Sequence, residues 1–387
     1  MNLRLAFSVT FSLAAPAAFA QAQDAPAVDP VLAHFREFRA ALDRGDAAAA
    51  EAAAQLAYDA SEAVNGQRTA VLAINLATLR LDLGKPTAAY APAQRAHELA
   101  TANQDSGVDP LVAALVLGRA ELAVDGASGA ERLREAIGQA ERRGDLQNEA
   151  YPAAVELART AFALEQYALA GEAWAASDRL AAGSPSDPAF ARGLARTGEG
   201  AAIFMQATAE SGRGPGTRPA VIARGAARDA NAALADALSL LQPFADGGDE
   251  GVLTLAQSAY AHALAWQGIL RAKMQSQGDE LPRAAGEGTA PLGGAARCAV
   301  RLVAEPPPAY PNDALLASGV GAVVIRARTD AQGAIVEHQI AAAIPAGSFS
   351  EAVAAVADQW RVEVAPDAAP GCRLDGTQYT PILFVAE

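Results

Sequence analysis

A pattern of small residues that recurs about every forty residues is the feature that most restricts how this chain can fold. In its clearest copy, a turn glycine at Gly84 is followed by Ala89 and Ala96 on a helical apolar pattern. Further copies lie at Gly45, Ala50 and Ala57 and, less regularly, in residues 123–137 and 162–177. Two antiparallel helices pack closely only where small residues lie at their crossing, and each hairpin leaves an apolar face for the next one. The pattern therefore predicts an α-solenoid of stacked helix hairpins.

This pattern resembles the tetratricopeptide repeat family, whose turn glycine and two packing alanines are matched at Gly84, Ala89 and Ala96. The resemblance covers residues 35–180. The period exceeds the ~34 residues usual for that family, and most of its aromatic positions are absent. An irregular alanine-rich helical bundle is the alternative. Apolar residues keep a helical spacing further along the chain, so we expect one helical-repeat domain over residues 31–275.

The first residues have the composition of a secretory signal peptide. Arg4 precedes an apolar run, and Ala18, Phe19 and Ala20 form a small-residue cleavage site before Gln21. We expect residues 1–20 to be removed and the protein to reside in a bacterial periplasm. The alternative is an uncleaved anchor in the inner membrane, in which case the chain would contact the membrane.

Composition and motifs argue against several classes of function. A formal net charge of −14 opposes binding to nucleic acid, because that binding needs cations to displace the counterions of phosphates. The one Gly-Lys step, Gly84-Lys85, is followed by Pro86 and so is no phosphate loop. The four histidines lie apart, with no metal-ligand spacing. We therefore expect no cofactor, no metal and no enzymatic activity.

The C-terminal part differs from the rest. Residues 276–297 are rich in glycine and proline and predict a flexible linker to a domain over residues 298–387. That domain shows alternating apolar residues typical of strands, and two amphipathic segments typical of helices. The expected order is a helix at 312–319, strands at 322–329 and 334–342 joined by a turn at 330–333, a helix at 348–360 and a strand at 377–386. This order predicts a small α+β domain.

The same stretch resembles the C-terminal domain of the TonB family, periplasmic proteins that transmit force to outer-membrane transporters. The matching residues are Tyr310-Pro311, Gly321, Val323, Asp330, Gly333, Trp360-Arg361 and the segment from Pro381 to Phe384. Pro307 stands where the family has glutamine, and the family's long spacer of proline with charged residues is absent. The resemblance implies that the domain binds an extended peptide along a free edge of its sheet.

We expect that edge to be the last strand, because it ends the chain's pattern and contains Pro381, a residue tolerated mainly in edge strands. Arg326 and Arg328, expected to be exposed, would favour an acidic partner segment. The alternative is that Tyr310 only packs and that the arginines are only solvated. The predicted partner-binding residues are Tyr310, Pro311, Arg326, Arg328, Gln378, Tyr379, Ile382 and Phe384.

Cys298 and Cys372 are the only cysteines, and they lie near the two ends of the C-terminal domain. An even number of cysteines in an exported chain favours a disulfide bond. Two free thiols or a redox pair remain the alternative, although a redox pair usually has C-x-x-C spacing.

The sequence thus predicts an exported, non-enzymatic scaffold whose C-terminal domain binds another protein of the cell envelope. A periplasmic or outer-membrane protein is the expected partner, with a TonB-dependent transporter as one example. The alternative is a TonB-type energy transducer that residues 5–20 anchor in the inner membrane.

Overall fold

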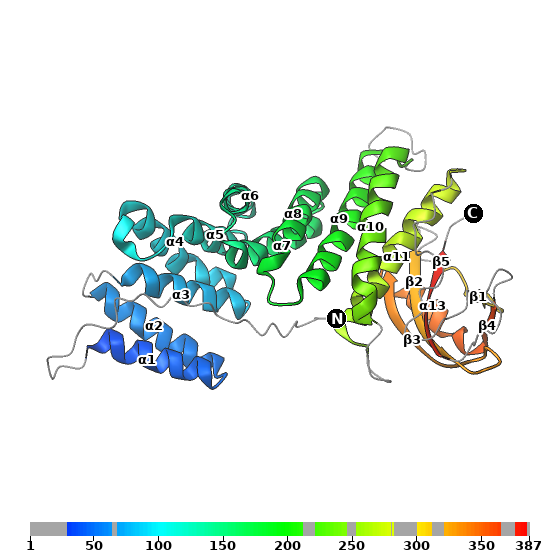
Figure 1. Ribbon diagram of the computed structural model, residues 1–387, viewed down its shortest axis with the longest axis horizontal. Helices are drawn as coiled ribbons and strands as arrows, with labels where there is room; N and C mark the ends of the chain where they lie inside the picture. The colour runs from blue at the N-terminus through cyan, green and yellow to red at the C-terminus, as the bar shows by residue number, and fades with distance from the viewer. Residues whose placement is uncertain are drawn as a thin grey trace. The chain divides into compact units, whose positions relative to one another are not determined.

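The computed structural model shows a mainly helical chain with a small region of two β-sheets near its C-terminus (Figure 1). Contacts divide the chain into two compact units, residues 1–164 with 179–185, and residues 165–178 with 186–387. The structure describes residues 29–63, 68–211, 221–245, 253–279, 281, 300–311, 321–364 and 376–384. The segments expected as signal peptide (1–20), most of the linker (276–297), the helix at 312–319 and both cysteines lie outside these residues.

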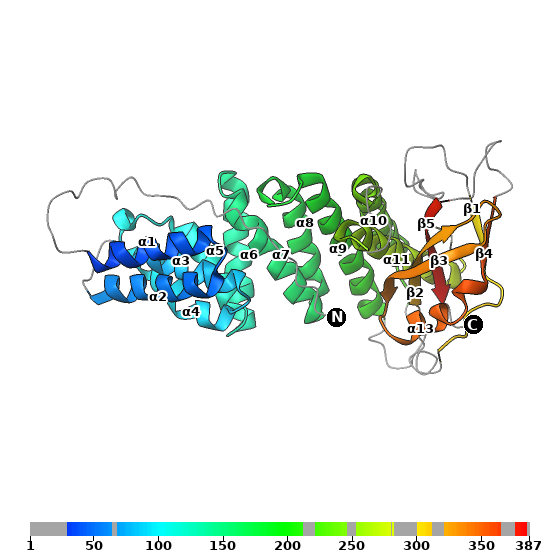
Figure 2. The ribbon, with the colours of Figure 1, turned by 90° about the horizontal axis from the view of Figure 1, so that it is seen from below.

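The first unit consists of helices in which each packs against the next along the chain (Figure 2). The odd-numbered helices α3, α5 and α7 also contact one another in succession. The helices are α1 (Pro30–Asp43), α2 (Ala47–Ala63), α3 (Thr69–Asp82), α4 (Pro86–Ala102), α5 (Pro110–Glu121), α6 (Gly126–Arg143) and α7 (Gln147–Ala163), with short 3₁₀ turns η2 (Gln104–Ser106) and η3 (Ala181–Gly183).

Tight turns join α1 to α2 and α3 to α4 at the predicted glycines. Gly45 and Gly84 have φ of 70° and 69°, a left-handed conformation that costs glycine little because it has no Cβ. After each glycine, the next N–H donates back across the turn, from Asp46 to the Ala41 carbonyl and from Lys85 to the Arg80 carbonyl. This bonding closes the C-terminus of the first helix in each pair and starts the second directly.

The predicted crossing positions are all filled by small residues without access to solvent. Ala89 and Ala96 on α4 are 0% exposed. At the same offsets from the other turns lie Ala50, Ala57, Gly129, Ala136, Ala170 and Ser177, and all are buried. The prediction that small residues occupy these positions is therefore confirmed, including the two less regular copies on α6 and α8 (Tyr167–Arg179).

Replacing Ala89 with leucine should lower the free energy of unfolding by about 1–3 kcal/mol, because a buried helix crossing has no room for three more carbons. Ala91, on the exposed side of the same helix, offers a matched control. Ala91→Leu should change stability by less than ~0.5 kcal/mol. Urea unfolding followed by circular dichroism would measure both, and equal tolerance at the two sites would contradict a crossing at Ala89.

Helices α1, α5 and α9 (Pro188–Ser211) begin in the same way, with an aspartate followed by proline. The Asp29 and Asp109 carboxylates accept hydrogen bonds from the backbone N–H groups of Val31 and Leu111, each at 3.0 Å or less. Asp187 does the same for α9. Proline suits the first helical position because its missing N–H would have no partner there.

In the second unit, helices α9, α10 (Arg224–Ala245) and α11 (Leu255–Ser276) pack together. Trp174 of α8 lies directly over Gly198 of α9, where an added Cβ would overlap its indole ring. Asp178, near the end of α8, pairs with Arg192 and Arg196 of α9 at 2.9 and 3.2 Å. Helix α8 is thereby held to α9 by packing and by charge.

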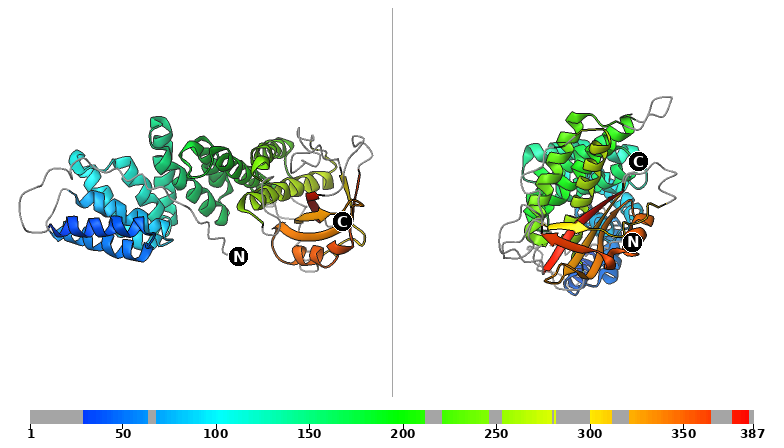
Figure 3. Two further views of the ribbon diagram at one scale, coloured as in Figure 1. Left: turned by 60° about the horizontal axis from the view of Figure 1, so that its bottom comes forward. Right: turned by 90° about the vertical axis from the view of Figure 1, so that its right-hand side faces the viewer.

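Five strands complete the second unit: β1 (Val300–Val303), β2 (Gly321–Thr329), β3 (Ile335–Ile344), β4 (Arg361–Val364) and β5 (Gly376–Phe384). The larger antiparallel sheet has the order β3-β2-β5, and β1 pairs with β4. Helix α11 packs on one face of the larger sheet, and the short helix α13 (Ser348–Ala354) packs on the other (Figure 3). Both faces of the larger sheet are thus covered by the chain itself.

One local expectation for this region was wrong, and two strands were not expected. The helix expected at 348–360 stops at Ala354, and a 3₁₀ turn η4 (Ala357–Gln359) follows it. Trp360 is extended and 2% exposed, and its indole N–H donates to the Pro306 carbonyl at 2.8 Å. The chain therefore continues as β4, which pairs with β1, and neither strand was expected from the sequence.

The larger sheet of the domain expected at 298–387 packs against helices that precede it in the chain. The sheet shares a core with α10 and α11, in which Ala322 and Val324 of β2 lie beside Leu234 and Leu270.

None of the helices in the described ranges combines the length and apolar character needed to cross a bilayer.

Candidate protein-binding site

Side chains along β2 alternate between the two covered faces of the larger sheet. Val323, Ile325 and Ala327 belong to the core under α13. Ala322 and Val324 belong to the core under α11. The alternation expected from the sequence is confirmed, and it places Arg326 and Arg328 on the side of α11.

The expectation that both arginines are exposed was wrong for one of them. Arg326 is only 8% exposed, because it lies in the centre of the sheet on the face that α11 covers. Arg328, two residues nearer the strand end, is exposed and pairs with Glu337 of β3 at 3.1 Å. Arg326 cannot meet a partner without displacement of α11, and only Arg328 remains as a surface cation of this strand.

The two edges of the larger sheet differ. Along β3, the chain itself covers the first residues: Ala334 bridges to Arg361, and His338 contacts Asp358 at 2.8 Å. On the other side, β5 pairs with β2 over its whole length and with no further strand in the described part of the chain. The expectation that the last strand lies at the edge of the sheet is confirmed for these residues.

The predicted contact residues on β5 mostly face inward. Ile382 and Phe384 are 8% and 4% exposed and belong to the core under α13. Tyr379 packs edge-on against Tyr260 of α11, with ring centroids 5.8 Å apart. Gln378 has a buried side-chain oxygen for which the described residues provide no hydrogen bond. These side chains hold β5 in place, and none of them is a ready contact for a partner.

Tyr310 also packs against the core. Its ring meets Phe349 and Phe384 edge-on, with centroids 5.7 and 6.0 Å apart, and burial raises the pKa of its hydroxyl. Pro311 follows it in an irregular segment. These contacts favour the alternative that Tyr310 is a packing residue at the end of β5.

Pro381 and Leu383 are the exposed residues among those of β5 whose burial is described, and Thr377 to Thr380 are half-buried. Leu383 is 39% exposed although it touches Gly268 of α11, and Pro381 is exposed as well. The apolar pattern of the sequence could not single out Leu383, since an exposed and a buried leucine look alike there. The candidate protein-binding site is therefore the outer edge of β5.

Pro381 indicates which backbone groups point outward. The β2–β5 register runs unbroken from Gly376 to Phe384, with Pro381 opposite Val324. Alternate residues of an antiparallel strand bond to the neighbour, and the others direct N–H and C=O away. Because proline has no N–H, it fits such a ladder at a position directed away from β2. Leu383, two residues on, has the same direction.

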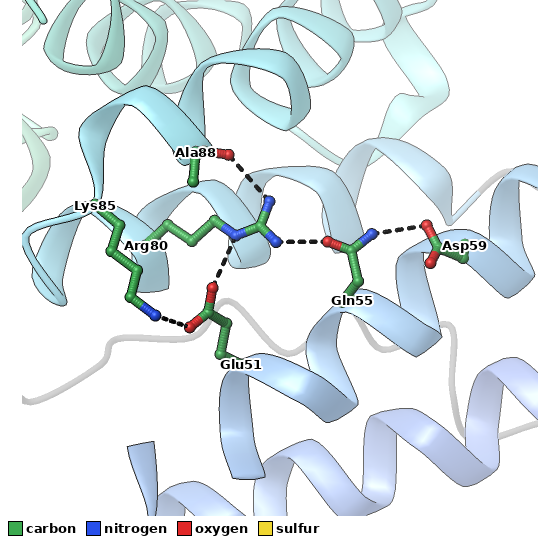
Figure 4. Close-up of polar contacts among 6 residues, drawn as sticks. All are labelled: Glu51, Gln55, Asp59, Arg80, Lys85 and Ala88. Atoms are coloured by element: carbon green, nitrogen blue, oxygen red, sulfur yellow. Dashed lines mark hydrogen bonds and ion pairs between the residues drawn. The ribbon is translucent and has the colours of Figure 1, made fainter. Parts of the chain in front are cut away.

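The helices of the first unit contain a polar cluster that bridges α2, α3 and α4 (Figure 4). Arg80 donates to Glu51 at 3.2 Å, to Gln55 at 2.6 Å and to the Ala88 carbonyl at 3.0 Å. Lys85 donates to the other oxygen of Glu51 at 2.5 Å, which together with Arg80 lowers the pKa of that carboxyl. All three guanidinium nitrogens are used internally, so the cluster joins helices and offers no ligand site.

Among the described residues, no group of three or more histidine, cysteine, aspartate or glutamate side chains could hold a metal ion. Neither a scan of protein-family models nor a search of curated protein sequences finds a match to the chain.

His97 on α4 is the histidine whose environment predicts a pH effect. Burial, followed by the nearby Arg132, lowers its pKa, and its buried Nδ1 has no hydrogen-bond partner in the described structure. Glu121, which pairs with Arg132 at 2.6 Å, and Glu98 oppose this shift. Protonation is therefore less favourable in the folded chain than in the unfolded chain.

The direction of the pH effect on stability follows from this shift. Below the pKa of about 6.5 that histidine has in the unfolded chain, the unfolded chain binds a proton at His97 more readily than the folded chain does. The free energy of unfolding therefore falls as the pH falls. We expect the loss of stability between pH 7.5 and 5.5 to be smaller in His97→Gln than in the wild type. Urea unfolding of both proteins at the two pH values would measure this difference. The same pH dependence in both would contradict the effect.

Proposed function

We propose that the protein is an exported, non-enzymatic scaffold that binds an extended segment of another envelope protein along the outer edge of β5. The observation that carries this proposal is the position of β5: it is an edge strand of a sheet whose two faces are already covered by α11 and α13. Edge strands direct backbone donors and acceptors outward, and a peptide strand can complete them. Binding by strand addition needs no pocket.

The family resemblances support the same proposal. The helical part is proposed to be a tetratricopeptide-like solenoid, on the basis of the buried small residues that follow each turn. The C-terminal sheet is proposed to be TonB-like, on the basis of the order of its elements and the landmarks at Tyr310-Pro311 and Trp360-Arg361. Because Arg326 is buried, a pair of arginines would not recognise the partner. Recognition would instead rest on the backbone of the partner segment and on those of its side chains that lie beside Pro381 and Leu383.

The full chain without residues 1–20 is the right material for the test, because the sheet shares its core with α10 and α11. We would probe it with an array of overlapping nine-residue peptides from the envelope proteins of the same organism. Binding peptides should slow amide exchange in β5, and they should compete with one another. If none binds, or if bound peptides protect only helices, strand addition at β5 is refuted.

The proposed export has its own test, the mass of the N-terminus of the protein in the producing cell. A chain beginning at Gln21 in the periplasmic fraction is expected. An intact Met1 in the membrane fraction would instead support the anchored energy transducer.

A further inference from the structure

We propose that Pro381 is a specificity-determining residue of the β5 edge, one that disfavours pairing with a second copy of this chain more than pairing with a different partner. This inference rests on the proposed function. It starts from a problem that every binding edge has: a strand able to accept a partner can also accept the identical strand of another molecule. Two copies of β5 would meet through a twofold axis, each offering the same residues.

Pro381 removes a different number of hydrogen bonds when β5 pairs with a different partner than when it pairs with a second copy of itself. Pro381 lies next to the middle of β5 and, because it has no N–H to donate to β2, fits a position whose backbone is directed outward. A different partner strand meets one Pro381 and leaves one of its own carbonyls without a donor. A symmetric pair of β5 strands that overlap at their centres contains two Pro381 residues, so two hydrogen bonds are missing.

The free energy lost through missing hydrogen bonds is therefore expected to be twice as large for self-association as for partner binding. The corresponding factor in the equilibrium constant is squared. One backbone hydrogen bond corresponds to about fivefold in affinity. Restoring the N–H should tighten a partner peptide about fivefold and self-association about 25-fold. Specificity of this kind acts by raising the free energy of the unwanted complex.

The surroundings of Pro381 do not suggest another role. It is exposed, so it fills no core. Its partner in β2, Val324, is fully buried in the core under α11, and Pro381 is not one of the residues of that core. Leu383 has an outward N–H on the same edge, so a control variant can remove a donor at that position.

The test uses the full chain without residues 1–20 and two variants, Pro381→Ala and Pro381→Thr. Sedimentation velocity would measure self-association, and titration with the tightest nine-residue peptide from the envelope-protein array would measure partner binding. Both variants should gain more in self-association than in peptide affinity, the former close to the square of the latter. Adding Leu383→Pro to Pro381→Ala removes an outward donor again and should reverse both gains, with the melting temperature confirming that the fold is kept.

The outcomes separate the two proposals. Equal gains in both equilibria, or no gain in self-association by either variant, would overturn the role of Pro381 and leave strand addition standing. If no peptide binds, the proposed function fails and the discrimination fails with it, even where the variants self-associate. Self-association that persists after Leu383→Pro is added would place the contact elsewhere and also overturn the inference.

Discussion

Gly129→Ala should lower the free energy of unfolding by about 3 kcal/mol, at the upper end of what one added methyl group costs in a packed interior. Gly129 lies on α6 at the crossing with α5, at the position that Ala50 and Ala89 occupy in the other hairpins. A Cβ there would overlap the backbone nitrogen of Leu122 and lie 2.8 Å from the carbonyl carbon of Glu121. Backbone cannot move aside as a side-chain tip can, so the two helices would have to separate.

The matched control is Gly126→Ala at the start of the same helix, where an added Cβ meets nothing within 4 Å. Because alanine favours helix over glycine, this change should be neutral or stabilise by up to ~1 kcal/mol. Urea unfolding of both variants measures the difference. Should Gly129→Ala be as stable as Gly126→Ala, the close approach of α5 and α6 is not present in solution.

Reduction of a bond between Cys298 and Cys372 should lower the free energy of unfolding by about 4 kcal/mol, the chain-entropy value for a loop of this size. Both cysteines lie outside the described residues, so the bond stays a prediction from the sequence. Cys298 precedes Val300 by two residues, and Cys372 follows Val364 by eight. Val300 and Val364 themselves lie opposite each other at one end of the β1–β4 pair.

Intact mass before and after reduction should differ by two hydrogen atoms in protein recovered from the periplasm, and the Cys298→Ser and Cys372→Ser variants should be equally destabilised. The double variant should be no less stable than either single variant, because one bond is lost in each case. Complete alkylation of both thiols without a reductant would show that no bond forms.

Local periodicity was enough to predict the helices and their turns. Gly45 and Gly84 mark turns because their positive φ suits glycine, and Ala89 and Ala96 mark a crossing because only small residues fit between close helices. These properties depend on neighbours a few residues away. Alternation along β2 and the turn at Gly333 were predictable for the same reason.

The candidate site depends on contacts between segments that are distant in the sequence, and some predictions for these segments were wrong. Arg326 alternates as a surface residue should, but α11 covers it, and no local pattern records which helix covers a strand. Trp360 continues a helical pattern, yet it is extended, and its indole N–H donates to the carbonyl of Pro306, a residue 54 positions away in the sequence.

The amino-acid sequence by itself thus indicated a mainly helical chain, the turns at Gly45 and Gly84, the small residues that are buried after them and the strand that contains Pro381. Only the tertiary structure decided that both faces of the sheet are covered and that Leu383 is exposed while Ile382 and Phe384 are not. The physical reason is that backbone conformation follows from steric and hydrogen-bonding preferences within a few residues. Burial, in contrast, is set by which apolar surfaces meet. In this protein the surfaces that bury the sheet come from α11, which precedes the strands in the chain, and from α13, which lies between β3 and β4.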